Sequence, residues 1–350
     1  MIAPSAGTRD SGARTLEFSG AAPDGCSTAA HPHDVSSKRH AMIIVTGTKR
    51  SGTSMWMQVL AAAGFPVLGT KFMRNWESTI KDANPHGFYE SLLRRGIYFA
   101  TNPHPKNGVY LRPDDTRQVA VKVFASGLAR SDLAYVDKVL VTMRPWQEYV
   151  SSLGRLYEME HSARIESHAA EGKPEPERPP HLDAHLEWWL DNYLIVRDIA
   201  TRGYPARITT YPRMLSDTRR VLSEVLGFLG AGDLDAALAT VKPETRTQTA
   251  PDVEVELPDR ARTLFDRLFE TVDGGAGLSV DLIAEMNEVH AILLPEIEEQ
   301  MRTLRKRRRR RAPSDPTLSA AILLDQVEEG IPSSDSLAEE TDGDAADVQS

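Results

Sequence analysis

The amino-acid sequence predicts an α/β protein with three layers, in which a mostly parallel central sheet lies between helices and carries helical insertions. Two observations favour this class. Short apolar segments typical of buried strands alternate with segments whose apolar residues recur at helical spacing. The first strand also leads through a polar, glycine-containing loop into a helix, which is how a strand–helix–strand unit begins.

Four segments have the composition of buried strands. The first, MIIVTG at 42–47, is a short apolar run that ends in glycine, although such a run alone does not distinguish a strand from a buried helix. Further strands are expected at VAVKVF (119–124), KVLVTM (138–143) and ARITTY (206–211). Because helical segments separate them, these strands are expected to pair in parallel.

Helical segments fill the intervals between the strands. The apolar residues from Trp56 to Ala63 recur on one helical face, and Gly64 is placed to end that helix. Further helices are expected from Pro145, along the stripe Leu182–Val196, over 214–230, and over 280–311 with a kink at Pro295. The segment ESHAAEGKPEPERPP at 166–180 is rich in Pro, Glu and Gly and is expected to be a mobile loop between two helices.

The chain has 350 residues, of which 41% are hydrophobic and 26% charged, as in ordinary soluble globular enzymes. This composition excludes collagen-like, wholly disordered and disulfide-scaffold proteins. The single cysteine, Cys26, excludes an internal disulfide and a cysteine-based zinc or iron–sulfur site, so a reducing compartment is expected. The sequence shows neither an apolar run of about 18 residues nor the apolar segment of a secretory signal, and a cytoplasmic location is expected.

Charge and composition divide the chain into four expected regions. These are a disordered N-terminal segment (1–40), one folded domain (41–301), a solvated basic helix end (302–311) and an acidic disordered tail (312–350). Subtracting the tail's −10 and the basic tract's +8 from the net charge of −9 leaves −7 for residues 1–301. This mildly acidic body argues against nucleic acid as a partner. Met42 is an alternative start of the chain.

The most informative segment is VTGTKRSGTSMW, which runs from the first strand through a loop into a helix. Glycine lets the backbone approach an anion, the free amides at a helix start point toward it, and the helix dipole adds positive potential. Lys49 and Arg50 add full positive charges. The segment therefore predicts a phosphate-binding loop.

This loop departs from the ATP-binding pattern G-x-x-x-x-G-K-[ST]. Gly47 and Gly52 have its spacing, but Thr53 stands where that pattern has lysine. The strands at 119–124 and 138–143 also lack a terminal aspartate that would hold Mg²⁺. Both departures argue against a P-loop kinase of a small molecule, which is kept as an alternative.

The turn R-S-G-T-S after a strand resembles the phosphosulfate-binding loop of sulfotransferases that use 3′-phosphoadenosine 5′-phosphosulfate (PAPS). It is most similar to the branch that includes bacterial and tyrosylprotein enzymes. The resemblance spans approximately residues 42–250 and implies a P-loop-type fold, PAPS as co-substrate and no metal. It also implies that Arg50 is catalytic and that the loop residues bind the 5′-phosphosulfate, namely Lys49, Arg50, Ser51, Gly52, Thr53 and Ser54.

A second segment extends the resemblance. KVLVTMRPWQEYVSS places Arg144 at a strand end and Ser152 eight residues later, similar to the family's arginine and serine that hold the 3′-phosphate. An arginine fork and a hydroxyl can both donate hydrogen bonds to a terminal phosphate. Because the usual Arg-x-Pro order is shortened to Arg144-Pro145, Ser151 is the alternative partner.

A third segment, NPHGFYE at 84–90, resembles a block common in bacterial sulfotransferases. In that resemblance Glu90 is the favoured general base and His86 the competing one. Lys122 lies within an apolar strand, where an uncompensated charge is unfavourable, so its amine is expected to extend from the strand end into the site. Arg246 stands where the family often has a second basic residue for the 3′-phosphate.

No metal site is predicted, because His181 and His185 are spaced i, i+4 without the glutamate and third ligand of H-E-x-x-H. The acceptor pocket is expected among residues 65–115 and the helices at 146–195, with a lid at 160–180.

The expected reaction is in-line sulfuryl transfer from PAPS to a hydroxyl or amine of a small-molecule, carbohydrate or peptide acceptor. The second alternative is a non-catalytic family member that binds a nucleotide or polyanion. The sequence predicts neither the acceptor nor the oligomeric state.

Overall fold

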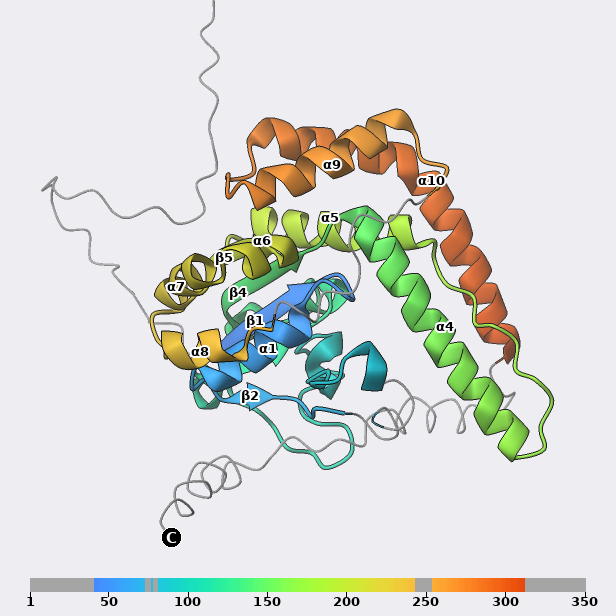
Figure 1. Ribbon diagram of the computed structural model, residues 1–350, viewed down its shortest axis with the longest axis horizontal. Helices are drawn as coiled ribbons and strands as arrows, with labels where there is room; N and C mark the ends of the chain where they lie inside the picture. The colour runs from blue at the N-terminus through green and yellow to red at the C-terminus, as the bar shows by residue number, and fades with distance from the viewer. Residues whose placement is uncertain (1–40, 73–76, 78–80, 243–253, 312–350) are drawn as a thin grey trace, which may run out of the picture.

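The computed structural model describes residues 41–72, 77, 81–242 and 254–311 (Figure 1). Within them a five-stranded sheet carries helices on both faces, which confirms the predicted α/β class. The N-terminal segment, the acidic tail and Arg246, for which the sequence makes predictions, lie outside the described residues.

The strands of the sheet are all parallel, in the order β2-β3-β1-β4-β5. Their bounds are Met42–Gly47 for β1, Val67–Leu68 for β2, Ala120–Lys122 for β3, Val136–Met143 for β4 and Ala206–Thr210 for β5. Four of them confirm predicted strands, although the last ends one residue early because Tyr211 begins a helix. The strand β2 has two residues and is too short for its composition to predict it.

The central position of β1 determines where a ligand can bind. Its neighbours on the two sides are β3 and β4, so the chain crosses from one side of β1 to the other between them. Open parallel sheets bind ligands where the direction of the crossovers reverses, beyond the carboxyl ends of the strands. Here β1 leads into the loop after Gly47, β3 ends with Lys122, and β4 and β5 are followed by Arg144 and Tyr211.

The helices of the described residues alternate with the strands. Their bounds are Thr53–Ala62 for α1, Ala125–Leu128 for α3, Trp146–Ala170 for α4, Ala184–Arg202 for α5, Tyr211–Ser216 for α6, Thr218–Leu229 for α7, Leu234–Thr240 for α8, Asp259–Asp273 for α9 and Val280–Arg311 for α10. On one face of the sheet, α1, α7 and α8 bury Ile43 and Val45. On the other face, α3 and α5 bury Ile44 of the same strand, as the two-residue period of a strand requires.

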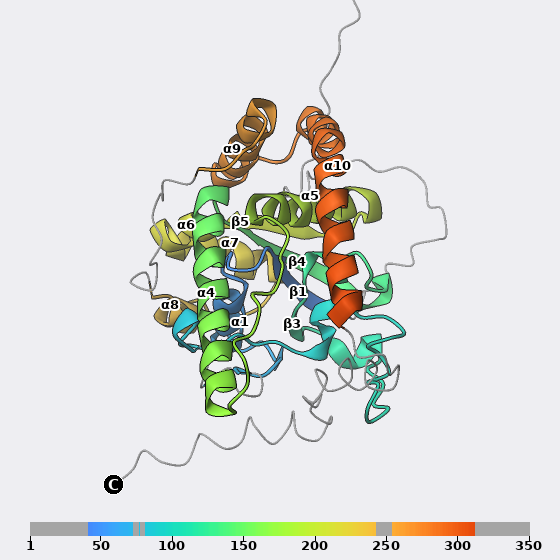
Figure 2. The ribbon, with the colours of Figure 1, turned by 90° about the vertical axis from the view of Figure 1, so that its right-hand side faces the viewer.

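A second helical cluster packs outside α5. It consists of α4, α9 and α10; α4 and α10 both lie on the right in Figure 1, and Figure 2, which faces that side, shows them apart, with α4 on the left and α10 on the right. Its centre is aromatic, with the Phe265 ring centroid 5.0 Å from those of Trp188 and Trp189. The Trp188 indole Nε1 donates to the Arg144 carbonyl oxygen at 2.8 Å. This core therefore fixes the backbone at the point where β4 turns into α4.

The loop expected at 166–180 is shorter in the structure. The helix α4 continues to Ala170, because the residues ESHAA lack the prolines and glycines that break helices. The helix ends where Gly172 adopts a left-handed conformation with φ of 65°, and Pro174 follows. The first part of the predicted lid is therefore the end of a long helix (Figure 2).

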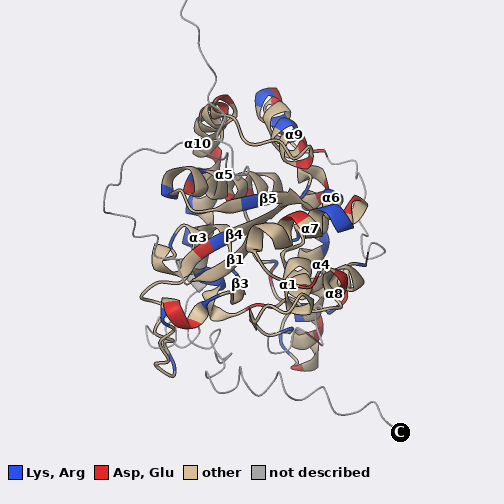
Figure 3. Cartoon of the chain, turned by 90° about the vertical axis from the view of Figure 1, so that its left-hand side faces the viewer, with Lys and Arg blue, Asp and Glu red and all other residues tan. Residues whose placement is uncertain are grey.

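The charges of the described residues are mixed in sign. Figure 3 shows basic and acidic segments alternating along α9, and both signs on the face that carries α6, α7 and α8. Among the described helices, none is both long and apolar enough to cross a lipid bilayer.

The glycine that ends β1 is required by close packing. Gly47 has φ of 149°, and a Cβ there would lie 2.2 Å from the Thr142 carbonyl oxygen of β4. We expect Gly47→Ala to destabilise the protein by on the order of 1–3 kcal/mol, because backbone atoms must move apart. The helical Gly227, whose added Cβ would have nothing within 4 Å, is the matched control, and Gly227→Ala should stabilise by about 0.5–1 kcal/mol. Urea unfolding measures both changes, and equal effects would contradict this account.

Candidate functional site

A cavity of about 440 Å³ lies at the carboxyl edge of the sheet. It is lined by residues of the loop after β1, of the segment 83–94, of the end of β3, of α4 and of the helix after β5. The sequence-predicted residues that line it are Lys49, Arg50, Gly52, Thr53, Ser54, His86, Glu90, Lys122, Arg144 and Ser152. The structure therefore brings together three motifs that are far apart in the sequence.

The loop between β1 and α1 is held by its own hydrogen bonds. The Ser51 hydroxyl donates to the Thr48 carbonyl oxygen at 2.7 Å, and the Thr142 hydroxyl donates to the Ser51 carbonyl oxygen at 2.9 Å. Ser51 is fully buried and is not among the residues that line the cavity. The Ser51 side chain therefore shapes the loop. Ser151, the alternative to Ser152, is also absent from the cavity lining.

Gly52 precedes α1 in a left-handed conformation with φ of 100°. A Cβ at this position would lie 2.7 Å from the Tyr211 ring, so glycine is needed for this contact. The first backbone N–H groups of α1 have no carbonyl partner within the helix and point out of its N-terminus, toward the loop. This geometry suits an anion.

Arg50 is the central cation of the cavity. Its backbone is left-handed, with φ of 64°, a conformation that typically requires about 1–3 kcal/mol in a residue other than glycine. Its Nη2 donates to the Ala83 carbonyl oxygen at 2.7 Å, and its Nε donates to the Ser152 hydroxyl at 3.3 Å. Burial and the neighbouring Arg144 guanidinium lower the pKa of Arg50 to about 10. Within the described residues no carboxylate forms an ion pair with it.

Arg144 lies beside Arg50 and fixes its backbone. The Arg144 Nη1 donates to the Arg50 carbonyl oxygen at 3.1 Å, and its Nε pairs with Glu148 at 3.1 Å. The guanidinium carbon is 5.3 Å from the centroid of the Tyr211 ring, at cation–π distance. Ser152, which the sequence pairs with Arg144, instead accepts a hydrogen bond from Arg50.

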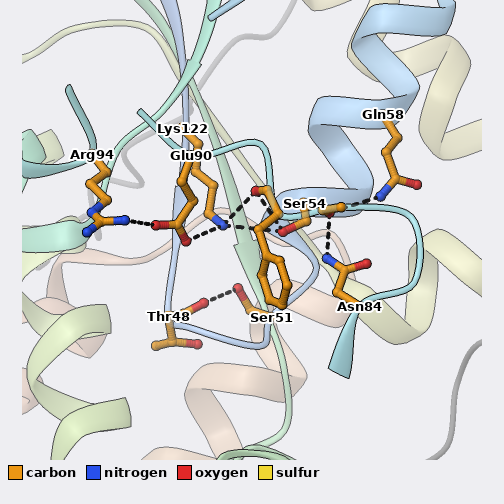
Figure 4. A network of polar contacts seen from close by, with 10 residues as sticks. Thr48, Ser51, Ser54, Gln58, Asn84, Glu90, Arg94 and Lys122 are labelled. Atoms are coloured by element: carbon orange, nitrogen blue, oxygen red, sulfur yellow. Dashed lines mark hydrogen bonds and ion pairs between the residues drawn. The ribbon is translucent and has the colours of Figure 1, made fainter. Parts of the chain in front are cut away.

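Lys122, Glu90 and Arg94 form a buried charge network (Figure 4). The Glu90 carboxylate accepts from Lys122 Nζ at 3.0 Å and from Arg94 Nη1 at 2.6 Å. Lys122 Nζ also donates to the Ser54 hydroxyl at 3.2 Å and to the Phe88 carbonyl oxygen at 3.1 Å. Burial alone would raise the pKa of Glu90, but Lys122 and Arg94 outweigh it and hold this pKa below its ordinary value.

The segment NPHGFYE forms a turn above α1. The Asn84 side-chain amide donates to the Gly87 carbonyl oxygen at 2.7 Å, and the Gly87 amide donates back to the Asn84 carbonyl oxygen at 3.1 Å. Figure 4 shows this turn beside Gln58 and Ser54 of α1. His86 lies at its exposed tip and lines the cavity, so both predicted bases reach the same cavity from one turn.

Lys49 lies at the opposite wall, between the loop and α5. Its Nζ pairs with Glu187 at 2.9 Å and lies 5.9 Å from the centroid of the Tyr157 ring. Burial alone would lower the pKa of Lys49, but the Glu187 carboxylate reverses this shift and raises it. The Tyr157 ring stacks on His181 with centroids 3.6 Å apart. This wall offers aromatic faces beside charged groups.

Several lining residues are not predicted from the sequence. Tyr211 directly follows β5, so its place at a strand end is the signal that identifies it. Leu156 and Glu160 follow Ser152 at four-residue intervals on α4, and this helical spacing places them on the cavity side. Burial raises the pKa of Glu160. Arg94 has no comparable signal, because its contact depends on the fold around Glu90.

Comparisons with known proteins give distant matches. No protein-family model matches the chain, and no curated protein matches it. Among the solved structures that match is the crystal structure of retinol dehydratase in complex with androsterone and the inactive cofactor PAP. The identity is 13%, the TM-score is 0.29, and the alignment covers 57% of this chain and 62% of that chain. The chain therefore spans less than two thirds of the length of this protein, and the likeness is too distant to assign an activity.

Proposed function

We propose that the protein is a sulfotransferase that moves a sulfuryl group from PAPS to a hydroxyl or amine acceptor. The observation that carries this proposal is the half-buried Arg50 guanidinium, which lies beside Arg144 at the start of α1 and forms no ion pair with a carboxylate of the described residues. A cation that is partly removed from water and lies beside a second cation is stabilised by an incoming counter-charge, so the cavity favours an anion.

The balance of charges in the cavity supports a ligand with more than one negative group. Among the described residues, two carboxylates line the cavity, those of Glu90 and Glu160, against six basic side chains, those of Lys49, Arg50, Arg94, Lys122, Arg144 and Lys242. The lining therefore has an excess of basic groups. PAPS is negatively charged at both its 5′-phosphosulfate and its 3′-phosphate, and its two ends match two adjacent subsites.

We assign the 5′-phosphosulfate to the loop and to the first turn of α1, from Gly52 to Ser54, with Arg50 and Lys122 as the cations. We assign the 3′-phosphate to Arg144 and Ser152. The hydrogen bond from Arg50 Nε to Ser152 and the one from Arg144 to the Arg50 carbonyl oxygen support an assignment in which the two subsites are adjacent.

The donor supplies the sulfuryl group: the acceptor oxygen or nitrogen bonds to sulfur while the bond from sulfur to the 5′-phosphate oxygen breaks, and the acceptor releases a proton. Arg50 stabilises the negative charge that develops on the leaving phosphate oxygen. Lys122 holds the sulfuryl oxygens, and Glu90 accepts the proton of the acceptor. Tyr157, Glu160 and His181 form the wall on which the acceptor lies.

A pH–rate profile distinguishes the two candidate proton acceptors. Because Lys122 and Arg94 hold the pKa of Glu90 below its ordinary value, Glu90 stays ionised and the rate falls only at a pH below the ordinary range of a glutamate. We therefore expect the profile of kcat against pH to show no acid limb between about pH 5 and pH 8. An imidazole base would instead give an acid limb near pH 6.5. Such a limb, removed by His86→Ala, would contradict the assignment of Glu90.

Ligand-induced stabilisation tests the proposed donor. We expect 3′,5′-adenosine bisphosphate at 100 times its Kd to stabilise the protein by about 2.7 kcal/mol, measured by thermal shift. ATP with Mg²⁺ should stabilise less, because Lys122 and Arg144 lie where a magnesium-binding aspartate would be needed. Preferential stabilisation by ATP–Mg²⁺ would favour the kinase, and stabilisation by heparin alone would favour the non-catalytic polyanion binder. Transfer of sulfur-35 from labelled PAPS into a host-cell extract then identifies the acceptor.

Arg144→Lys tests the 3′-phosphate subsite separately. The lysine keeps a positive charge beside Glu148 but lacks the planar fork that binds a phosphate through two hydrogen bonds. We expect this variant to bind 3′,5′-adenosine bisphosphate about 10–100-fold more weakly, equivalent to about 1.4–2.8 kcal/mol. Its affinity for adenosine 5′-phosphosulfate should be almost unaffected. Calorimetry measures both ligands, and an equal loss for the two would contradict this assignment.

A further inference from the structure

Three side chains able to ligate a metal lie together away from the cavity. They are Asp183, just before α5, His185 in the first turn of α5, and Glu296 on α10. One ligand atom from each lies within 4.8 Å of those of the other two. None of the three lines the 440 Å³ cavity, so this cluster is separate from the site described above.

A second observation distinguishes this cluster from ordinary surface acids. The His185 side chain is only 6% exposed, and its Nε2 has no hydrogen-bond partner within the described part of the chain. An unpartnered buried nitrogen is unfavourable, and such groups require an explanation. A bound ion that accepts its lone pair provides one.

The two carboxylates are also held side by side. The Gln300 amide nitrogen donates to Asp183 Oδ2 at 2.7 Å and to Glu296 Oε1 at 3.3 Å. Its amide oxygen accepts from the Asp183 backbone N–H at 3.0 Å. A neutral amide orients the two negative groups but does not neutralise them. The pair is therefore arranged for a cation between α5 and α10.

We propose that Asp183, His185 and Glu296 bind one divalent transition-metal ion, with Zn²⁺ as the best match. Zinc binds imidazole nitrogen and carboxylate oxygen at about 2.0–2.2 Å, which places tetrahedral ligands about 3.3 Å apart. The present ligand atoms lie within 4.8 Å of one another, so we expect the two exposed carboxylates to move closer to His185 when the ion binds. Mg²⁺ and Ca²⁺ prefer oxygen ligands alone and bind here more weakly.

The ion joins two parts of the chain. It links the segment that enters α5 to the middle of α10, and His181, two residues before Asp183, lines the cavity through its stack on Tyr157. Its role is structural: it restrains the connection between α4 and α5 at the acceptor wall. The sequence does not predict this site, because Glu296 reaches it only through the packing of α10.

Zinc binding to the full-length, chelator-treated protein tests the proposal. We expect isothermal titration calorimetry to show one Zn²⁺ per chain and a higher melting temperature, with MgCl₂ giving neither. Cobalt chloride should give the visible absorption of a four-coordinate site. His185→Gln and Glu296→Gln should each weaken Zn²⁺ binding by at least about 10–100-fold. Glu298→Gln, an exposed acid two residues along the same helix, is the matched control and should bind normally.

Two results would overturn the proposal. One is the absence of saturable Zn²⁺ binding, and the other is equal Zn²⁺ binding by the native protein and by Glu296→Gln. Because Glu296 is exposed, its substitution keeps the test valid if His185→Gln does not fold. Binding of 3′,5′-adenosine bisphosphate is measured separately and bears only on the donor cavity.

Discussion

Replacement of Arg50 by alanine should lower the rate of sulfuryl transfer by on the order of 10²–10³. The guanidinium is half-buried at the start of α1 and has no ion pair with a carboxylate of the described residues, so its loss removes the group positioned where charge develops on the leaving oxygen. The fold should survive, because removal of this charge also relieves its repulsion with Arg144. Single-turnover transfer from labelled PAPS measures the rate, and thermal melting measures the fold.

Two control variants sharpen this experiment. Arg50→Gly removes the same guanidinium but suits the left-handed backbone at φ of 64°, so it should be inactive and at least as stable as Arg50→Ala. Arg130→Ala removes an exposed arginine that does not line the cavity and should transfer at the native rate. Near-native turnover by Arg50→Gly would refute the role of this residue.

Replacement of Lys122 by methionine should have the largest effect on stability. Lys122 Nζ makes three hydrogen bonds, and its loss leaves the buried Glu90 with Arg94 as its remaining cation. Breaking a buried ion pair from one side typically destabilises by about 3–5 kcal/mol. In a domain of this size each kcal/mol lowers the melting temperature by about 2–4 °C. Urea unfolding gives the free energy directly.

The exposed pair of Lys81 and Glu77 provides the comparison. Its two side chains are 48% and 62% exposed, so Lys81→Met should change the unfolding free energy by less than about 1 kcal/mol. Addition of Glu90→Gln to Lys122→Met should recover part of the loss, because the buried carboxylate that has lost one of its two cations is then replaced by a neutral amide. If the two lysine variants were equally stable, the buried network would not have the importance given to it here.

The sequence predicts this fold and much of the site because their signals are local. The apolar run before Gly47 and the basic loop after it occupy consecutive residues, and the structure has β1, the loop and α1 there. Lys122 can be predicted as a site residue because a charged side chain within an apolar strand needs polar partners. Strand ends that converge at one edge then bring Arg144 to the same cavity.

Contacts between distant elements could not be predicted in this way. Arg50 and Ser152 are 102 residues apart, and the bond between them depends on how α4 leaves the sheet. The Tyr211 ring packs against Gly52 and lies under the Arg144 guanidinium, although neither residue is near it in the sequence. The extension of α4 to Ala170 is not predicted for another reason. The prolines after Ala170 dominate the composition of the segment 166–180, so the whole segment is predicted as a loop.

The hydrogen bond from the Arg144 guanidinium to the Arg50 carbonyl oxygen has a consequence for how the two halves of a nucleotide donor are recognised. The side chain assigned to one end of the donor also holds the main chain of the residue assigned to the other end. Occupancy of either half thus pre-organises the remaining half, and fragments that each fill one subsite should bind with positive cooperativity.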